Sequence, residues 1–381
     1  MKTSSNLGIY IHIPFCIRKC RYCDFSSFVV ADTSVHDAYV TNLCKEIENR
    51  KNEVGTDYLV DSIYLGGGTP SILAPKHISK ILNTISKNYN ILENVEITIE
   101  ANPGAISKSS LSSYYESGIN RLSIGAQSFN NDILGFLGRI HKAEDTIAGY
   151  ADAISAGFEN ISLDLIFGIP EQSLEMWASD LKSAITLGPK HISHYSLQIE
   201  EGTPIYNDWE QGKIKQLDEE VDREMYHTAE EILNGAGYQR YEISNSSKPN
   251  YESRHNLKYW NMDEYMGFGL GAHSYTNRCR YSNTSVLQEY LDADDTINMQ
   301  NFFHENTLDE EMSEFIFLGL RRSEGISLDE FNRRFKKNFE NLYGVKTKEM
   351  IGKGLLVVER GNLRLTTLGF DLANTVFCEY V

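Results

Sequence analysis

The stretch "GIYIHIPFCIRKCRYCDF", residues 8–25, joins a short apolar run to three closely spaced cysteines. β-Branched and aromatic residues dominate residues 8–13, which is typical of a strand. Cys16, Cys20 and Cys23 follow with the spacing C-x3-C-x2-C. Structural zinc normally takes four closed ligands, whereas three thiolates on one tight loop suit an iron–sulfur cluster with one open iron. The alternatives are three buried cysteines or part of a zinc site.

Further runs of strand character follow along the chain, separated by segments with apolar residues at helical spacing, such as residues 77–89. Strand–helix alternation over ~200 residues predicts parallel strands with right-handed crossovers. Six such units predict an α/β fold with an open or partial (β/α)6 barrel, whose functional residues lie at the C-terminal ends of the strands. The predicted strands are residues 8–13, 61–67, 95–101, 121–127, 161–168 and 192–199.

The pattern changes after the barrel, and three units are expected. Residues 1–210 form the partial barrel, residues 211–300 a barrel extension, and residues 301–381 a small α+β domain that resembles a winged helix. In the last unit a strand pair turns at Arg360, Gly361 and Asn362. Winged helices often bind DNA, but a packing or lid domain is the favoured interpretation because of the charge of the chain.

Composition and charge restrict the function. The chain has 381 residues and a formal net charge of −17, which argues against binding to nucleic acid. The sequence shows no signal peptide and no apolar run of bilayer length, so a cytoplasmic protein with reduced thiols is expected. The remaining cysteines, Cys44, Cys279 and Cys378, are isolated and are expected to be packing residues.

The cysteine motif, with an aromatic residue before the third cysteine, resembles the radical S-adenosylmethionine (radical SAM) enzymes. The resemblance implies a [4Fe–4S] cluster held by Cys16, Cys20 and Cys23, with S-adenosylmethionine on the open iron. In that family an electron from the cluster cleaves the sulfonium to give a 5′-deoxyadenosyl radical. It also implies a partial (β/α)6 barrel, and it places Tyr22 near the adenine.

Further motifs resemble the HemN-like branch of this superfamily, the branch of the coproporphyrinogen dehydrogenases: "YIHIPFC", "LGGGTPS", "IEANP", "GAQSF", "GRIH" and "DLIFGIP". The glycine-rich loop is expected to offer free backbone N–H groups to the cofactor carboxylate. A second S-adenosylmethionine binds in some members. By resemblance, the residues that bind S-adenosylmethionine are Tyr10, Tyr22, Gly67, Gly68, Thr69, Glu100, Gln127, Arg139 and Asp164.

Two departures separate this sequence from the dehydrogenases. They carry a fourth cysteine where this chain has Phe25, and they have an N-terminal extension that is not seen ahead of residue 8. Both features, together with "RHNLKYW" at residues 254–260, resemble the haem-chaperone (HemW) group, which is thought to bind haem and deliver it to apo-haemoproteins. The alternative is an enzyme, a radical SAM oxidoreductase such as an oxygen-independent coproporphyrinogen-III dehydrogenase.

His255 in the HNxxYW segment is a candidate haem ligand, with Tyr259 and Trp260 as aromatic surface. In the competing interpretation His255 makes hydrogen bonds at the barrel rim and the aromatic residues pack in the core. His273 is a rival ligand. Membrane recruitment and a homodimer are further hypotheses that come with the resemblance.

Overall fold

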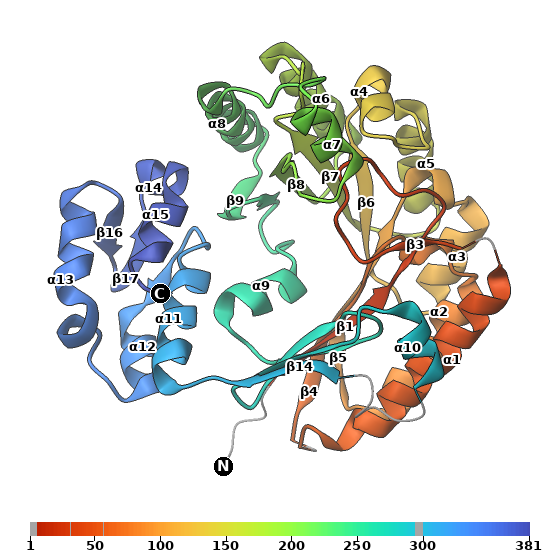
Figure 1. The fold of residues 1–381 in the computed structure, drawn as a ribbon, viewed down its shortest axis with the longest axis horizontal. Helices are drawn as coiled ribbons and strands as arrows, with labels where there is room; N and C mark the ends of the chain where they lie inside the picture. The colour runs from red at the N-terminus through yellow and green to blue at the C-terminus, as the bar shows by residue number, and fades with distance from the viewer. Residues whose placement is uncertain (1–5, 31, 56, 294–299) are drawn as a thin grey trace.

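One long sheet carries most of the chain. The structure, a computed structural model, describes residues 6–30, 32–55, 57–293 and 300–381. Within these residues twelve strands form the sheet, in the order β14-β13-β12-β11-β1-β4-β5-β6-β7-β8-β10-β9. Figure 1 shows the sheet curving around a central space, with helices on its outer side.

The six predicted strands lie next to one another in the middle of this sheet, and each pairs in parallel with the next. The prediction of a partial (β/α)6 barrel is therefore confirmed. These strands are β1 (Asn6–Ile13), β4 (Leu59–Gly67), β5 (Ile91–Ala101), β6 (Arg121–Gln127), β7 (Asn160–Phe167) and β8 (His191–Ser196).

The outer helices bury one apolar face against the sheet. In α2, Ile78, Ile81, Leu82 and Ile85 recur at helical spacing and are all buried, and Pro75 begins the helix. The helices of the barrel are α1 (Thr33–Asn49), α2 (Pro75–Asn88), α3 (Lys108–Glu116), α4 (Asn131–Phe136), α5 (Ala143–Ser155), α6 (Leu174–Leu187), α7 (Pro204–Glu210) and α8 (Glu219–Gly235).

The predicted last strand, residues 192–199, was too long, because β8 ends at Ser196. Leu197 is buried and Ile199 partly buried in a separate apolar cluster with Ile133 and Ile205. These apolar residues fill that cluster beside α4 and α7, so their hydrophobicity does not indicate a longer strand.

Both edges of the barrel sheet are extended by strands that the sequence did not predict. β11 (Tyr265–Phe268) pairs in parallel with β1, and an antiparallel series continues from it. The added strands are β9 (Gln239–Glu242), β10 (Asn245–Ser247), β11, β12 (His273–Thr276), β13 (Cys279–Asn283) and β14 (Gln300–Glu305), with α9 (Arg254–Asn261) and α10 (Leu287–Asp292) between them.

The C-terminal part packs around a core of its own, which includes Phe315, Phe331 and Leu363. β16 and β17 form the predicted hairpin, joined by Arg360 and Gly361. Figure 1 shows this unit beside the barrel. Its elements are α11 (Leu308–Gly319), β15 (Ile326–Ser327), α12 (Leu328–Phe335), α13 (Phe339–Gly352), β16 (Leu356–Glu359), β17 (Asn362–Leu365), α14 (Thr367–Asp371) and α15 (Ala373–Cys378).

The isolated cysteines differ in their surroundings. Cys44 is buried in the main core, as expected of a packing residue, and Cys279 is half-buried. Cys378 is exposed, so the expectation that it packs in the interior is wrong. It stands at the end of α15, the last helix, where the buried residues are its neighbours Val376 and Phe377.

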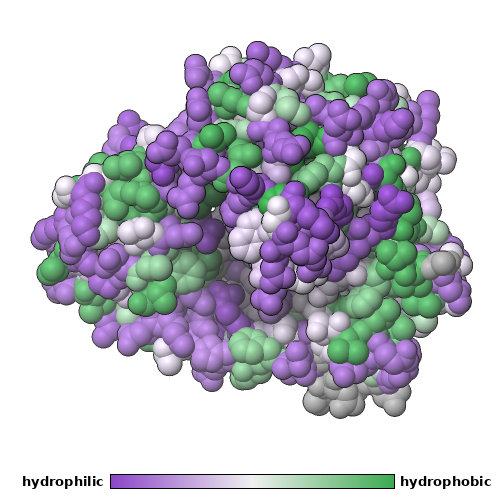
Figure 2. Space-filling view, turned by 45° about the horizontal axis from the view of Figure 1, so that its top comes forward, coloured by the Kyte–Doolittle hydropathy of each residue, from purple (hydrophilic) through white to green (hydrophobic). Residues whose placement is uncertain are grey.

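The surface is largely hydrophilic on the face that Figure 2 shows. Figure 2 shows hydrophilic side chains over most of one face, with hydrophobic side chains in smaller groups between them. Among the described residues, no helix has both the length and the apolar character needed to cross a bilayer.

Candidate functional site

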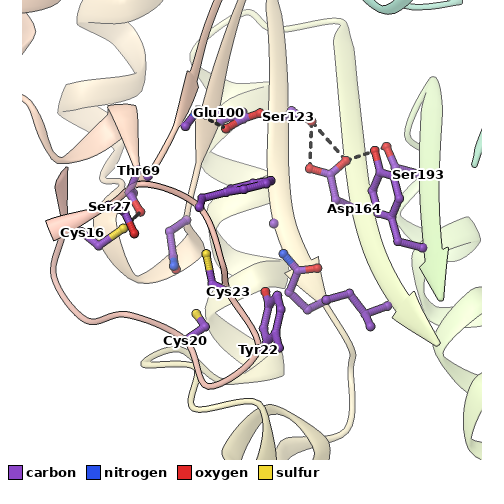
Figure 3. Close-up of a pocket in the computed structure, with 18 of the residues that line it drawn as sticks. Cys16, Cys20, Tyr22, Cys23, Ser27, Thr69, Glu100, Ser123, Asp164 and Ser193 are labelled. Atoms are coloured by element: carbon purple, nitrogen blue, oxygen red, sulfur yellow. Dashed lines mark hydrogen bonds between the residues drawn. The ribbon is translucent and has the colours of Figure 1, made fainter. Parts of the chain in front are cut away.

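The three cysteines lie on one loop at the C-terminal end of β1. Cys16 belongs to the short strand β2 (Phe15–Cys16), which pairs with β3 (Phe28–Val29), and the loop between these strands carries Cys20 and Cys23. The Arg21 amide donates to the Leu137 carbonyl at 3.0 Å and ties the loop to the barrel. Figure 3 shows the three thiols and Tyr22 around one cavity.

This cavity has a volume of about 440 Å³ and lies inside the barrel. It is lined by all three cysteines and by every predicted S-adenosylmethionine residue except Tyr10. The Tyr10 hydroxyl instead hydrogen-bonds the Nδ1 atom of His12 at 3.0 Å, and its ring stacks on Tyr64. His255 does not line the cavity either.

The glycine-rich loop closes tightly over the cysteine strand. A Cβ atom on Gly68 would lie 2.8 Å from the Phe15 carbonyl and 3.1 Å from the Cys16 sulfur, so only glycine fits beside this thiol. The Thr69 hydroxyl also lies 3.6 Å from that sulfur. The loop therefore fixes the position of Cys16.

The expectation of free backbone N–H groups in this loop is wrong. The Gly67 amide donates to Glu100 at 3.1 Å, and the amides of Gly68 and Thr69 donate to the carbonyls of Ile13 and Phe15 at 2.8 Å each. Glycines permit this close approach between the loop and the strand. Because the loop amides already donate to protein acceptors, they are not free to bind the carboxylate of a cofactor. The loop shapes the site through backbone contact.

Two half-buried carboxylates face the cavity from neighbouring parts of the barrel. Glu100 accepts from the Tyr64 hydroxyl at 2.8 Å, and burial raises its pKa to about 7. Asp164 accepts from the hydroxyls of Ser123 at 2.9 Å and Ser193 at 2.7 Å, as Figure 3 shows. Burial also raises the pKa of Asp164. Both groups can receive a cationic ligand.

Arg139 connects the cysteine loop to the barrel wall. Its Nη1 atom donates to the Cys20 sulfur at 3.4 Å and its Nη2 atom to the Gly125 carbonyl at 2.8 Å. Gln127, at the end of β6, has a left-handed backbone with a φ of 64°, a strained conformation of the kind that clusters at binding sites. Burial raises the pKa of the Tyr22 hydroxyl, against the opposing effect of Arg139.

His255 lies at the other end of the barrel. α9 packs against β4, where Lys258 pairs with Asp61 at 2.7 Å, and its first amides, those of Arg254 and His255, donate to Glu96 of β5. The ring of His255 is buried, with Nδ1 3.0 Å from the Ser62 hydroxyl and Nε2 3.0 Å from the Tyr259 hydroxyl. Burial lowers its pKa to about 3. Both ring nitrogens are thus engaged and the ring is neutral.

His273 differs from His255 in its surroundings. It begins β12 and is exposed. Trp260, the other aromatic residue of the HNxxYW segment, is half-buried, and its ring contacts the Arg321 guanidinium at 5.3 Å.

Sequence reasoning missed a group of residues that line the same cavity, and a signal for some of them was present. Along β6, the residues that line the cavity alternate with the buried Leu122, Ile124 and Ala126. This alternation in the sequence could have shown that Arg121 and Ser123 share one face of the strand with Gln127. The missed lining residues include Tyr64, Arg121, Ser123, Ser193, Tyr195 and Asn256.

The barrel and the C-terminal unit each match a known family. Residues 10–184 match the radical SAM superfamily and residues 306–372 match the HemN C-terminal domain. Over 98% of its length the chain is 36% identical to the heme chaperone HemW of Lactococcus lactis, covering 96% of that protein. The chain belongs to the HemW family.

Other HemW relatives and one solved structure agree. HemW of Bacillus subtilis is 36% identical, with 97% of each chain covered. The coproporphyrinogen III oxidase HemN of Escherichia coli, described as a radical SAM enzyme, superposes with a TM-score of 0.86 at 24% identity, covering 99% of this chain and 90% of HemN. At this identity the likeness to HemN concerns the fold.

Membership of the radical SAM superfamily implies a [4Fe–4S] cluster and S-adenosylmethionine as cofactors of this HemW-family protein. Its residues fit them. The three thiols line one cavity together with the glycine-rich loop and the carboxylates of Glu100 and Asp164. No three His, Cys, Asp or Glu side chains of the described ranges are arranged around a single metal ion, whereas in a cluster each cysteine binds a different iron.

Proposed function

We propose that this chain is a haem chaperone of the HemW type, which binds haem and transfers it to apo-haemoproteins in the cytoplasm. The observation that carries the proposal is the 36% identity, over nearly the whole chain, to proteins named heme chaperone HemW. Phe25 supports it, because this residue stands where the dehydrogenases have a fourth cysteine. Its side chain is 59% exposed and lines the mouth of the cavity.

In this proposal Cys16, Cys20 and Cys23 hold the [4Fe–4S] cluster, which when bound supplies an electron and an open iron for S-adenosylmethionine. Arg139 donates to the Cys20 sulfur, and the close contact at Gly68 orients the Cys16 thiol. Glu100 and Asp164 offer carboxylates to the cationic groups of S-adenosylmethionine. The other proposed contacts are Tyr10, Tyr22, Gly67, Thr69 and Gln127.

The cysteine loop also provides apolar surface for haem or for a recipient protein. Ile17, Phe25 and Val29 are each about half exposed or more, and all three lie on or beside this loop. Such a group of exposed apolar side chains suits a hydrophobic ligand. We propose that haem contacts this loop at the mouth of the cavity.

His255 and His273 are the two proposed haem ligands, and His255 can serve only if its ring changes hydrogen-bond partners. His255 can bind iron only if its Nε2 atom gives up Tyr259 or its Nδ1 atom gives up Ser62. His273 is exposed and needs no such rearrangement. Haem titrations of wild type, His255→Ala and His273→Ala, followed by absorption, distinguish the two. A haem spectrum that is unchanged in His255→Ala removes His255 as ligand.

We propose the same three units as the sequence predicts: barrel 1–210, extension 211–300 and C-terminal domain 301–381. Haem and apo-haemoproteins are the proposed partners, with a homodimer and peripheral membrane contact as further proposals, and nucleic acid is not among the partners. Transfer is tested by mixing the haem-loaded protein with an apo-haemoprotein. Appearance of the holo spectrum supports the proposal, and protoporphyrinogen formed from coproporphyrinogen III would instead establish the dehydrogenase alternative.

A further inference from the structure

Arg121 is a buried cation that faces the barrel cavity without a partner. It begins β6 at the end remote from the cysteine loop, and 2% of its surface is exposed. Its Nε atom is buried without a hydrogen-bond partner, and among the residues that the structure describes no ion pair or hydrogen bond to its guanidinium occurs. The side chain nevertheless lines the cavity.

Among the described residues, Arg50 is the other arginine as buried as Arg121, and its guanidinium is paired. Arg50 pairs with Glu46 at 2.7 Å and donates to the Gly267 carbonyl at 2.8 Å. Two half-buried arginines are intermediate cases: Arg139 donates to Cys20 and Gly125, while the Arg321 side chain makes no hydrogen bond or ion pair within the described ranges and its guanidinium lies over the rings of Trp260 and Phe377. The charges of Glu96 and Asp164 stabilise the Arg121 cation, but they leave its N–H groups without hydrogen-bond acceptors, and a ligand in the cavity can supply these acceptors.

The surroundings of Arg121 define the kind of ligand. Glu96, the acidic residue with the strongest electrostatic effect on Arg121, directs its carboxylate to the Arg254 and His255 amides at the start of α9. Asp164 lies in the same cavity and accepts its hydrogen bonds from serine hydroxyls. In this acidic setting a group with a single negative charge is favoured over a phosphate dianion. A planar guanidinium binds a carboxylate with two parallel hydrogen bonds.

We infer that Arg121 is the anchor of a ligand carboxylate at the floor of the barrel. Arg121 lies four residues before Gly125 on β6, roughly 13 Å along the strand. Gly125 marks the level of the cysteine loop, because Arg139 donates to its carbonyl and to the Cys20 sulfur. A carboxylate at Arg121 is therefore a different group from one at the cluster. The choice of ligands rests on the proposed function, since haem and a second S-adenosylmethionine, bound away from the cluster, both carry carboxylates, whereas the site itself does not require that function.

The test compares each acid with a form that lacks the carboxylate. Binding of S-adenosylmethionine and its decarboxylated analogue, and of haem and its dimethyl ester, is measured on cluster-loaded wild type and Arg121→Gln. We expect Arg121→Gln to weaken one of the acids at least tenfold and its carboxylate-free form less than twofold. The acid whose binding weakens in Arg121→Gln is the ligand whose carboxylate Arg121 binds. Arg18→Gln, an exposed cation lining the same cavity, is the matched control.

Equal losses for an acid and its carboxylate-free form, or no loss for either acid, would overturn the inference. Absence of any haem binding would refute the proposed function, while the S-adenosylmethionine pair still tests Arg121. Arg121→Met adds a readout that a structural role would not produce. Without ligand it is expected to melt at the same temperature as wild type or higher, and a lower melting temperature would show that Arg121 stabilises the fold.

Discussion

Both ends of the barrel carry ionisable residues, but these face an open cavity at one end and are enclosed by a helix at the other. At the cysteine end, Glu100 and Asp164 face an open cavity and have raised pKa values. At the other end, α9 fills the space, and His255 and Lys258 use their polar atoms on Ser62, Tyr259 and Asp61. Polar groups that face an open cavity indicate a binding site, whereas polar groups enclosed with their partners, as on α9, indicate a structural joint. Arg121 lies toward the α9 end but faces the cavity, so it belongs with the first kind.

The largest expected effect is at the cysteine end. Cys20→Ser should abolish cluster assembly, because one iron loses its thiolate and the remaining two cysteines cannot hold the cluster. Cluster assembly is measured by the iron content and the visible absorption band of the reconstituted protein. Cys378→Ser, an exposed cysteine, is the control and should retain about four irons per chain. Full iron content in Cys20→Ser would place the cluster elsewhere.

At the α9 end, His255→Ala should destabilise the fold by about 2–4 kcal/mol, because it removes a buried ring and leaves polar partners unsatisfied. Denaturant unfolding measures the change. His273→Ala, at an exposed site, should stay within about 0.5 kcal/mol of wild type. If His255→Ala kept full stability but lost haem, the ring would belong to a binding site and the comparison between the two ends would fail.

The open carboxylates should make ligand binding pH-dependent. With a pKa of about 7, Glu100 is mostly protonated at pH 6 and mostly ionised at pH 8. Affinity for the cationic S-adenosylmethionine should therefore rise by about tenfold over this interval. The Glu100→Gln variant corrects for titration of the ligand and should show a smaller rise. Parallel pH profiles for the two proteins would exclude Glu100 as the responding group.

The smallest expected effect concerns the apolar rim. Phe25→Ser should leave the free energy of unfolding within about 0.5 kcal/mol of wild type, because the ring is 59% exposed. Haem affinity should fall about fivefold, as expected for loss of ~1 kcal/mol of apolar contact. Phe303→Ser is matched in exposure at 61% and lies on β14, so it should not change haem affinity. An equal effect of both substitutions would contradict a specific rim contact.

The sequence predicted much of the barrel because its strands carry local signals. Alternating and β-branched residues identify the six parallel strands, and the cysteine spacing identifies the loop. The pairing of β11 with β1 could not be predicted, since it joins Gly8 to Tyr265 across most of the chain and β11 has four residues. The engaged amides of Gly68 and Thr69 likewise depend on contact with a distant strand.

The sequence also could not show at which end of the barrel each candidate residue lies. His255 and Glu100 are equally plausible ligands as residue types, and only the packing of α9 shows that one is enclosed. Arg121 could have been found, because it shares the inward-facing positions of β6 with Ser123 and Gln127. Its lack of a partner becomes evident only in three dimensions.

The central claim is that this HemW-family protein carries haem. It is tested most directly by loading the cluster-reconstituted protein with haem and adding an apo-haemoprotein, in parallel with an incubation with coproporphyrinogen III and S-adenosylmethionine. We expect stoichiometric haem binding, transfer of haem to the acceptor and no protoporphyrinogen. Robust protoporphyrinogen formation without haem transfer would contradict it.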